Sequence, residues 1–252
     1  MSVASEARKH LRDAHRIVVK VGTHVVMHDG VELALGRIME IVEGLARLRK
    51  AGREIVLVSS GAVGLGMQEL GLTERPRSLG LRQACAAVGQ SHLMAFYTQA
   101  LGARGVKAAQ VLLTQEDLGD RDRALCVRTT LMRLIELGVV PVLNENDSVS
   151  IAELVEHRRA SRERAQALPA GAQRGGDGTL PGARAESSGA AEAAPVGFGD
   201  NDGLSARVAV SLDADLLVLL TNVAGLFTAN PKDDPSARRV GEVAVVDEAL
   251  MA

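Results

Sequence analysis

The sequence predicts an α/β protein, a three-layer sandwich in which helices cover both faces of a mainly parallel central sheet. Short apolar runs rich in Val, Ile and Leu alternate with longer segments whose apolar residues recur at helical spacing. The short runs are apolar throughout and do not alternate with polar residues, which indicates strands buried on both faces. With 252 residues, 46% of them hydrophobic, the chain is long enough to bury one substantial core.

Five strands and four helices follow from this pattern when it is taken in chain order. The predicted strands are the apolar runs 17–21, 55–58, 109–113, 139–143 and 216–220. The predicted helices cover 35–50, 81–101, 122–137 and 204–212, and the second carries a potential break near Gly89. Because strands and helices alternate, each helix can return the chain across the sheet to begin a parallel strand.

Residues 157–195 depart from this pattern. They are rich in Ala, Gly, Pro and Ser, contain no aromatic residue, and include Thr179 as their one β-branched residue. Such a segment buries too little apolar surface to offset the entropy lost on ordering it. We therefore predict a disordered insertion at 157–195.

The composition argues against several classes of partner. The 29 basic and 31 acidic residues leave a net charge of −2, so the overall charge does not favour nucleic acid or an anionic membrane. No apolar run approaches the roughly 18 residues of a membrane helix, and the first fifteen residues lack the apolar stretch of a secretory signal. Cys85 and Cys126 have neither metal-ligand nor redox spacing, so we interpret them as buried thiols of a cytoplasmic protein and predict no metal-binding residues.

Lys20 is the first candidate for chemistry. It lies within the first apolar strand, where an unpaired ammonium group would be costly to bury, so it requires an anionic partner. A structural salt bridge would supply that partner. A bound phosphate would also supply it, and Gly22 would let the backbone approach such a phosphate closely. The residues alone leave both explanations open.

Four further polar segments follow predicted strands or open a predicted helix, where parallel α/β proteins bind their ligands. These segments are SSGAVGLG at 59–66, NEND at 144–147, GDNDG at 199–203 and TNVAGLF at 221–227. Each also has a structural explanation, as a helix-packing turn, a hydrogen-bonded turn, a helix cap or an ordinary connection. The glycine spacing of the first segment matches neither the dinucleotide-binding fingerprint nor a Walker A loop.

Taken together and in order, the motifs resemble one family. They are KVGT, LVSSGAVGLG, QACAAVGQSHLMAFY, QVLLTQEDLGDR, VVPVLNENDSV, GDNDGLSA and LLTNVAGLFTANP. These segments are similar to those of the glutamate 5-kinase group of the amino acid kinase family, and to the kinase half of the pyrroline-5-carboxylate synthases. The resemblance implies one amino acid kinase domain over 1–252, interrupted by the insertion. It also implies that the C-terminal part is missing, because the family's Gly-Gly-Met-x-x-Lys-type loop, with its second phosphate-binding lysine, does not occur before Ala252.

The resemblance further implies a reaction, in which ATP phosphorylates the side-chain carboxylate of L-glutamate to give L-glutamyl 5-phosphate, the first step of proline biosynthesis. Lys20 and Asp202 would be the catalytic residues, and Mg²⁺ would be bound through ATP. The nucleotide would contact Lys20, Gly22, Thr23, Thr221 and Asn222, although the family usually has Asp at the last position. Glutamate would contact Ser60, Gly61, Asn146, Asp147 and Asn201.

Two alternatives stay open beside this reaction. Without the second lysine, the chain would be a catalytically impaired protein that binds glutamate or regulates another enzyme. A family member acting on another acid, such as aspartate or acetylglutamate, is the other alternative. The resemblance also suggests feedback inhibition by proline and a homo-oligomer in the cytoplasm.

Overall fold

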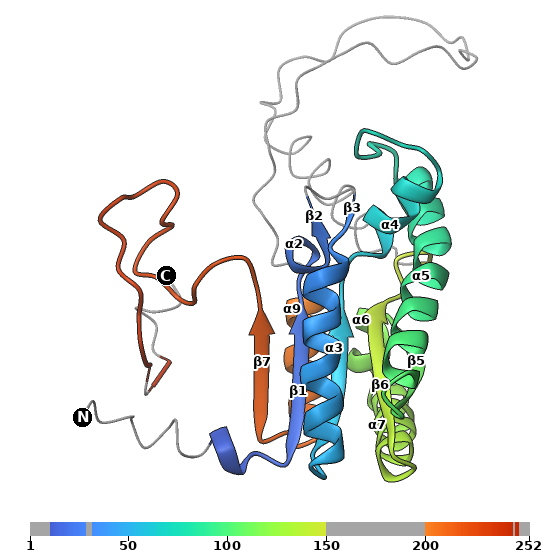
Figure 1. Ribbon diagram of the computed structural model, residues 1–252, viewed down its shortest axis with the longest axis vertical. Helices are drawn as coiled ribbons and strands as arrows, with labels where there is room; N and C mark the ends of the chain where they lie inside the picture. The colour runs from blue at the N-terminus through green and yellow to red at the C-terminus, as the bar shows by residue number, and fades with distance from the viewer. Residues whose placement is uncertain (1–10, 29–31, 150–199, 244, 247–252) are drawn as a thin grey trace, which may run out of the picture.

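A five-stranded parallel sheet forms the centre of the protein (Figure 1). The structure, a computed structural model, describes residues 11–28, 32–149, 200–243 and 245–246, so the predicted insertion 157–195 lies outside the described residues. The strands lie in the order β5-β6-β4-β1-β7, and every neighbouring pair is parallel. They are β1 (Arg16–Val21), β4 (Glu54–Ser59), β5 (Lys107–Leu113), β6 (Val139–Glu145) and β7 (Leu216–Leu220). All five strands overlap the predicted runs, which confirms the predicted parallel α/β class.

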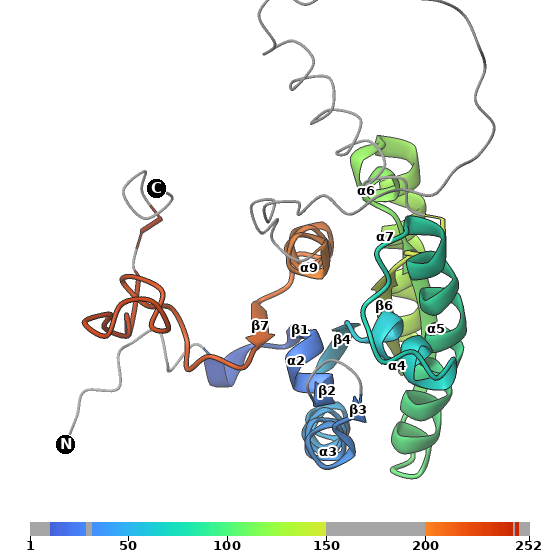
Figure 2. The ribbon, with the colours of Figure 1, turned by 90° about the horizontal axis from the view of Figure 1, so that it is seen from above.

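Helices pack on both faces of the sheet and complete the three predicted layers. One face is covered by α3 (Leu35–Lys50) and α5 (Leu79–Gly102), and the other by α7 (Arg121–Glu136) and α9 (Asp200–Ser211). Figure 2 shows α3 and α9 on opposite sides of β1.

Side chains of β1 alternate between the two layers of the core. Val19 and Val21 belong to the apolar cluster that includes α3 and α5, whereas Val18 belongs to the cluster that includes α7 and α9. Because both faces are covered, the strand is apolar on each side, which is the pattern seen in the sequence. Lys20 interrupts that pattern on the second face.

Shorter elements connect the main ones. They are α2 (Thr23–Val26), β2 (Met27–His28), β3 (Glu32–Leu33), α4 (Ala62–Glu69) and α6 (Gln115–Gly119). The strands β2 and β3 form a separate antiparallel pair. These elements are two to eight residues long, too short for hydrophobic periodicity to predict them.

The expected break in the second long helix is wrong, because α5 runs without interruption from Leu79 to Gly102. A Cβ atom on Gly89 would lie 1.9 Å from the carbonyl oxygen of Ala62, and one on Gly66 would lie 1.8 Å from the carbonyl oxygen of Cys85. Both glycines therefore let α4 and α5 pack backbone against backbone. One helical glycine costs only about 1 kcal/mol, too little to break a helix that is held by packing.

The two cysteines differ in their surroundings. Cys85 is buried, as predicted, but Cys126 is exposed on α7, so its prediction as a buried thiol is wrong. The face of α7 that packs against the sheet is formed by the buried residues Leu131 and Ile135, and the exposed Cys126 does not belong to it. Among the described residues, no helix is long and apolar enough to cross a membrane.

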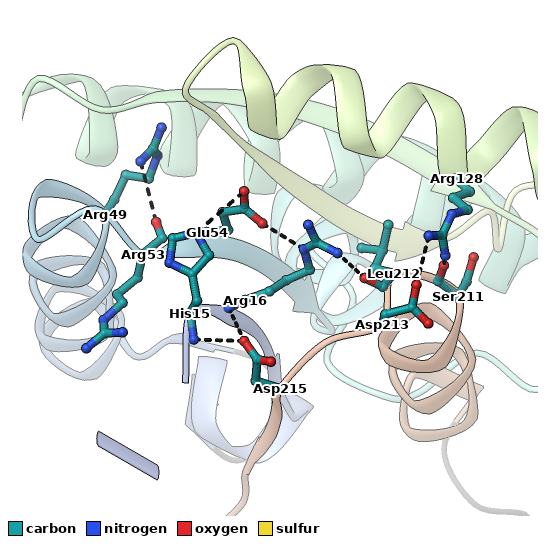
Figure 3. A network of polar contacts seen from close by, with 10 residues as sticks. All are labelled: His15, Arg16, Arg49, Arg53, Glu54, Arg128, Ser211, Leu212, Asp213 and Asp215. Carbon is teal, nitrogen blue, oxygen red and sulfur yellow. Dashed lines mark hydrogen bonds and ion pairs between the residues drawn. The ribbon is translucent and has the colours of Figure 1, made fainter. Parts of the chain in front are cut away.

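A polar network holds the amino ends of the strands together (Figure 3). Oδ2 of Asp215 accepts hydrogen bonds from the backbone N–H groups of His15 and Arg16, at 2.8 and 2.7 Å, and these bonds hold the pKa of Asp215 below its usual value. Nε of Arg16 donates to Oε2 of Glu54 at 2.7 Å. The network ties the starts of β1, β4 and β7 to one another. The polar segments singled out in the sequence lie at the opposite edge of the sheet, where the strands end.

Candidate active site

The carboxyl ends of β1 and β7 lie side by side, at the upper edge of the sheet in Figure 1. Gly22 follows the last residue of β1. The N–H of Gly22 donates to the carbonyl oxygen of Leu220 at 3.1 Å. A Cβ atom at this position would lie 3.3 Å from Nζ of Lys20 and 3.5 Å from that carbonyl oxygen, so a side chain here would crowd the amine. The exposed Thr23 follows Gly22, and the exposed Thr221 follows Leu220.

These positions gather the predicted nucleotide-contacting residues at one part of the edge. Asn222 is exposed beside Thr221, whose hydroxyl donates to Oδ1 of Asn222 at 3.4 Å. Gly22, Thr23, Thr221 and Asn222 thus lie just after two strands that pair side by side, an adjacency that the sequence did not predict.

Lys20 forms an ion pair with Asp202, and Nζ lies 2.6 Å from Oδ1. The lysine side chain is 11% exposed and the aspartate side chain 36% exposed, so the pair lies at the boundary between core and solvent. Asp202 stands in the first turn of α9, where its charge also favours the helix dipole. The structure therefore supplies the salt-bridge partner that a buried lysine needs, and it brings the two predicted catalytic residues into contact.

Asn201 joins three elements of the site. Its Nδ2 donates to Oγ of Ser60 and to Oδ1 of Asn144, both at 2.9 Å. Its Oδ1 accepts from the backbone N–H of Glu145 at 3.3 Å. Ser60 follows β4, Glu145 ends β6, and Asn201 lies in the first turn of α9. One amide therefore connects segments that are 56 and 141 residues apart in the sequence.

Asn144 and Gln90 belong to this cluster although the sequence analysis did not select either as a site residue. Nδ2 of Asn144 donates to Oε1 of Gln90 at 2.7 Å, and Asn144 is buried. Asn144 stands in the NEND segment that was singled out, so a search for buried polar residues at strand ends would have found it. Gln90 carries no comparable signal, because it is one polar residue within the long helix α5.

Gly61 shapes the turn that presents Ser60. Its φ is 109°, a left-handed conformation that glycine adopts without strain, and it precedes the first residue of α4. The N–H of Ser60 donates to the carbonyl oxygen of Val21 at 3.0 Å, which fixes the turn to the end of β1. A Cβ atom on Gly61 would lie 3.1 Å from Cγ1 of Val26. The turn thus requires glycine for its conformation.

A cavity of about 280 Å³ adjoins this cluster, between the helices α4 and α5 and the ends of β5 and β6. Its lining residues are Ala62, Ala86, Ala87, Gln90, Ser91, Gln110, Leu112, Glu145, Asn146, Asp147 and Ser148. Two of the five predicted glutamate-contacting residues, Asn146 and Asp147, line it. The other three, Ser60, Gly61 and Asn201, do not line the cavity itself.

The end of β6 is held in place by backbone and side-chain bonds. The N–H of Asn146 donates to the carbonyl oxygen of Leu113 at 2.8 Å, and the hydroxyl of Ser148 donates to Oδ1 of Asn146 at 2.6 Å. Glu145 is only 4% exposed. Within the described parts of the chain, no group of three or more His, Cys, Asp or Glu residues could hold a metal ion.

Tyr97, on α5, contacts the end of β4 next to the site. Its hydroxyl lies 2.9 Å from Oγ of Ser59, the residue before Ser60, and the ring is fully buried. Burial raises the pKa of Tyr97 to about 12, and the hydrogen bond with Ser59 only partly opposes that rise. The phenol therefore stays neutral and holds the end of β4 against α5.

Comparison with known proteins identifies the family of the chain. The model of the amino acid kinase family matches residues 15–168 and 179–251. The glutamate 5-kinase of Polaromonas sp. is 43% identical over 242 residues, which are 96% of this chain and 53% of that protein. The enzymes of the same name from Gloeobacter violaceus and Moorella thermoacetica are each 43% identical, over 236 and 226 residues, with 93% and 90% of this chain and 53% and 49% of their own lengths covered.

The extent of these matches differs between this chain and its relatives. The chain spans about half the length of the curated relatives it matches. Among solved structures, the product complex of isopentenyl phosphate kinase from T. acidophilum matches with a TM-score of 0.47 and 18% identity, and the match covers 88% of this chain and 76% of that one. The family model itself covers most of the sequence, including the ends of all five strands. The chain therefore belongs to the amino acid kinase family.

Proposed function

We propose that the chain carries the glutamate-binding and phosphoryl-transfer residues of a glutamate 5-kinase, which uses ATP to convert L-glutamate into L-glutamyl 5-phosphate for proline biosynthesis. The observation that carries the proposal is the convergence of Lys20, Asp202, Ser60 and Asn201 at one edge of the sheet. The 43% identity with enzymes of that name supports the choice of substrate over other members of the family.

The chemistry of this reaction suits a site without a general base. The side-chain carboxylate of glutamate has a reference pKa near 4.3, so it is already ionised and nucleophilic at neutral pH. Its attack on the γ-phosphorus of ATP forms an O–P bond and releases ADP. Both reactants are anions, so the protein must position them and neutralise their charge.

Lys20 is the residue proposed to neutralise that charge. The amine, which is paired with Asp202, lies close to Gly22. A Cβ atom on that glycine would be only 3.3 Å from Nζ. The space left by Gly22 would allow a phosphate oxygen to approach the amine. Asp202 would hold the amine in position, and Asn201 would place the hydroxyl of Ser60 toward glutamate.

ATP and Mg²⁺ fit the residues present in different ways. Gly22, Thr23, Thr221 and Asn222 would receive the nucleotide at the ends of β1 and β7. Bound Mg²⁺ supplies charge neutralisation and orientation of the phosphates, and it commonly keeps phosphate and water ligands in such sites.

A hydroxylamine assay tests the proposal. Glutamate and magnesium-ATP should yield an acyl phosphate, which hydroxylamine converts into a hydroxamate that is detected as its coloured complex with ferric iron. Lys20→Ala should reduce this product at least a hundredfold, because the transferring phosphoryl group loses its counter-charge, while glutamate binding changes little. The control is Lys50→Ala at the exposed end of α3, which should retain full activity. Full activity in Lys20→Ala would exclude the assigned role.

One observation favours a second candidate, a protein that binds glutamate without phosphorylating it. Lys20 already has an ionic partner in Asp202, so the pair could serve the fold alone. In that case, calorimetry should detect glutamate binding but no magnesium-ATP binding. The hydroxamate should then be absent from the wild-type protein as well as from the Lys20 variant.

A further inference from the structure

The orientations of the side-chain amides in the site are set by a backbone group. The N–H of Glu145 can only donate, and it lies 2.9 Å from Oδ1 of Asn144 and 3.3 Å from Oδ1 of Asn201. The oxygen of each asparagine amide must therefore face this N–H. Each Nδ2 group must face the opposite way, toward Gln90 in one case and toward Ser60 in the other.

This orientation determines how Gln90 is turned. Because Nδ2 of Asn144 donates at 2.7 Å, the atom of Gln90 that receives it must be the oxygen Oε1. The two N–H groups on Nε2 then point elsewhere, and they form no hydrogen bond within the part of the chain that the structure describes. Gln90 is partly buried and lines the 280 Å³ cavity, so these donors are available to a ligand there.

Asn146 presents a second amide to the same cavity. The hydroxyl of Ser148 donates to Oδ1 of Asn146, which leaves Nδ2 without a hydrogen-bond partner among the described residues. Both residues line the cavity, one from α5 and one from the segment after β6. The cavity thus offers amide N–H donors from two separate elements.

These donors favour one class of ligand group. Amide N–H groups bind acceptors, and a carboxylate is the strongest acceptor that a small amino acid carries. A ligand with negative charge alone, such as inorganic phosphate, is disfavoured, because the cavity is lined by Glu145 and Asp147, while its described lining includes no Lys or Arg. The acidic residues suit the ammonium group of an amino acid.

We propose that Gln90 contacts the substrate, donating from Nε2 to a carboxylate of an acidic amino acid in this cavity, and thereby helps to select that class of substrate. The identification of the amino acid as L-glutamate rests on the proposed function. The carboxylate contact rests only on the amide orientations and on the cavity. Gln90 would thus have two roles, since its oxygen also holds Asn144.

Two substitutions at this position separate direct contact from support of Asn144. Gln90→Glu keeps an acceptor for Asn144 but replaces the two N–H donors with negative charge. Gln90→Leu removes both the acceptor and the donors. Gln99→Glu, an exposed position further along α5, is the matched control for an added charge on this helix. Thermal melts monitored by circular dichroism would verify that all variants are folded.

The readout is the dissociation constant of the full chain, measured by calorimetry, for L-glutamate and for glutarate, which lacks the ammonium group and should therefore bind more weakly to the wild type. Direct contact predicts that Gln90→Glu weakens binding about tenfold or more, and more than Gln90→Leu does, because the new carboxylate repels the ligand. Gln99→Glu should bind as the wild type does. In ¹⁵N spectra, the side-chain amide of Gln90 should shift on addition of either acid.

The opposite order would overturn the inference. If Gln90→Leu weakens binding while Gln90→Glu binds normally, the residue only supports Asn144, and if neither variant weakens binding, it has no role in the site. Should the wild type bind these acids in a Gln90-dependent way without phosphorylating glutamate, the proposed function fails and the carboxylate contact stands. Absence of binding by the wild type at millimolar concentrations would contradict both.

Discussion

Replacing Gly89 by Ala should destabilise the protein strongly, although alanine is the better helix former. The new Cβ atom would lie 1.9 Å from the carbonyl oxygen of Ala62 and 2.4 Å from the backbone nitrogen of Gly66. Both atoms belong to the backbone of α4, so no side chain can rotate to relieve the clash.

The geometry sets the size of the effect. Ordinary van der Waals contacts begin near 3.4 Å, so the Ala62 oxygen would have to move by about 1.5 Å. Such a shift separates α4 from α5 along a contact that is backbone against backbone. Overpacking of a core commonly costs 1–3 kcal/mol, and we expect about 3 kcal/mol or more here because the obstacle is backbone. The higher helix propensity of alanine offsets at most about 1 kcal/mol of this cost.

Urea unfolding monitored by circular dichroism measures this loss directly. The control is Gly44→Ala within α3, where a Cβ atom would meet nothing within 4 Å. That substitution should stabilise the protein by about 0.5–1 kcal/mol, since only helix propensity changes. The same chemical change should therefore have opposite signs in the two helices.

The effect should also reach the site, because Ala62 and Gln90 flank this contact and line the cavity. We expect Gly89→Ala to weaken glutamate binding, while Gly44→Ala leaves it unchanged. A neutral or stabilising effect of Gly89→Ala would contradict the close packing of α4 against α5 described above. It would also contradict the described position of the turn at Ser60, which precedes α4.

Three further predictions concern titratable groups. Tyr97→Phe should cost about 1 kcal/mol of stability, since Ser59 loses its hydrogen bond with the phenol hydroxyl. Tyr97 is the only tyrosine in the sequence, so absorbance near 295 nm reports its ionisation alone. We expect the native phenol to ionise near pH 12 and not near pH 10. Because its folded pKa is raised, the neutral phenol stabilises the fold below about pH 10, and this contribution disappears as the pH rises toward 12. Asp117 forms a capping box with the N-cap residue Thr114 at the start of α6, and hydrogen bonds with Thr114 lower the pKa of Asp117. Asp117→Ala should therefore lose about 1 kcal/mol at neutral pH. Unfolding experiments should show this difference from the wild type disappearing as the pH falls through the lowered pKa and the carboxylate is protonated. Asp215→Ala should lower the melting temperature without changing glutamate affinity in calorimetry, because its bonds join strands at the edge away from the site (Figure 3); weaker affinity would show that the two edges are coupled.

The main strands and helices could be predicted from the sequence because their signals are local. The strand ends follow apolar runs such as 216–220, and the helix over 35–50 was predicted with the same bounds that the structure gives. Gly89 was misleading for the opposite reason. Its propensity is a local property, but its role comes from a tertiary contact with α4 that no spacing in the sequence reveals.

The candidate site was predictable only in part. The partner of Lys20 could not be chosen from the residues alone, because a salt bridge and a phosphate satisfy the same charge, and Asp202 is 182 residues away in the chain. Asn144 and Gln90 were missed because their importance lies in mutual hydrogen bonds. Burial of Cys126 was predicted from residue type, but α7 places this side chain on its exposed surface.

The most direct test of the proposed phosphoryl transfer follows one oxygen atom. L-Glutamate labelled with ¹⁸O in its side-chain carboxylate is incubated with the full chain and magnesium-ATP in unlabelled water. If the carboxylate attacks the γ-phosphorus, the bridging ¹⁸O stays with phosphorus when the α-amino group later displaces the phosphate. Mass spectrometry should then find inorganic phosphate with one ¹⁸O, in an amount that Lys20→Ala abolishes. Unlabelled phosphate, from attack by water on ATP, or no phosphate at all would contradict the proposed reaction.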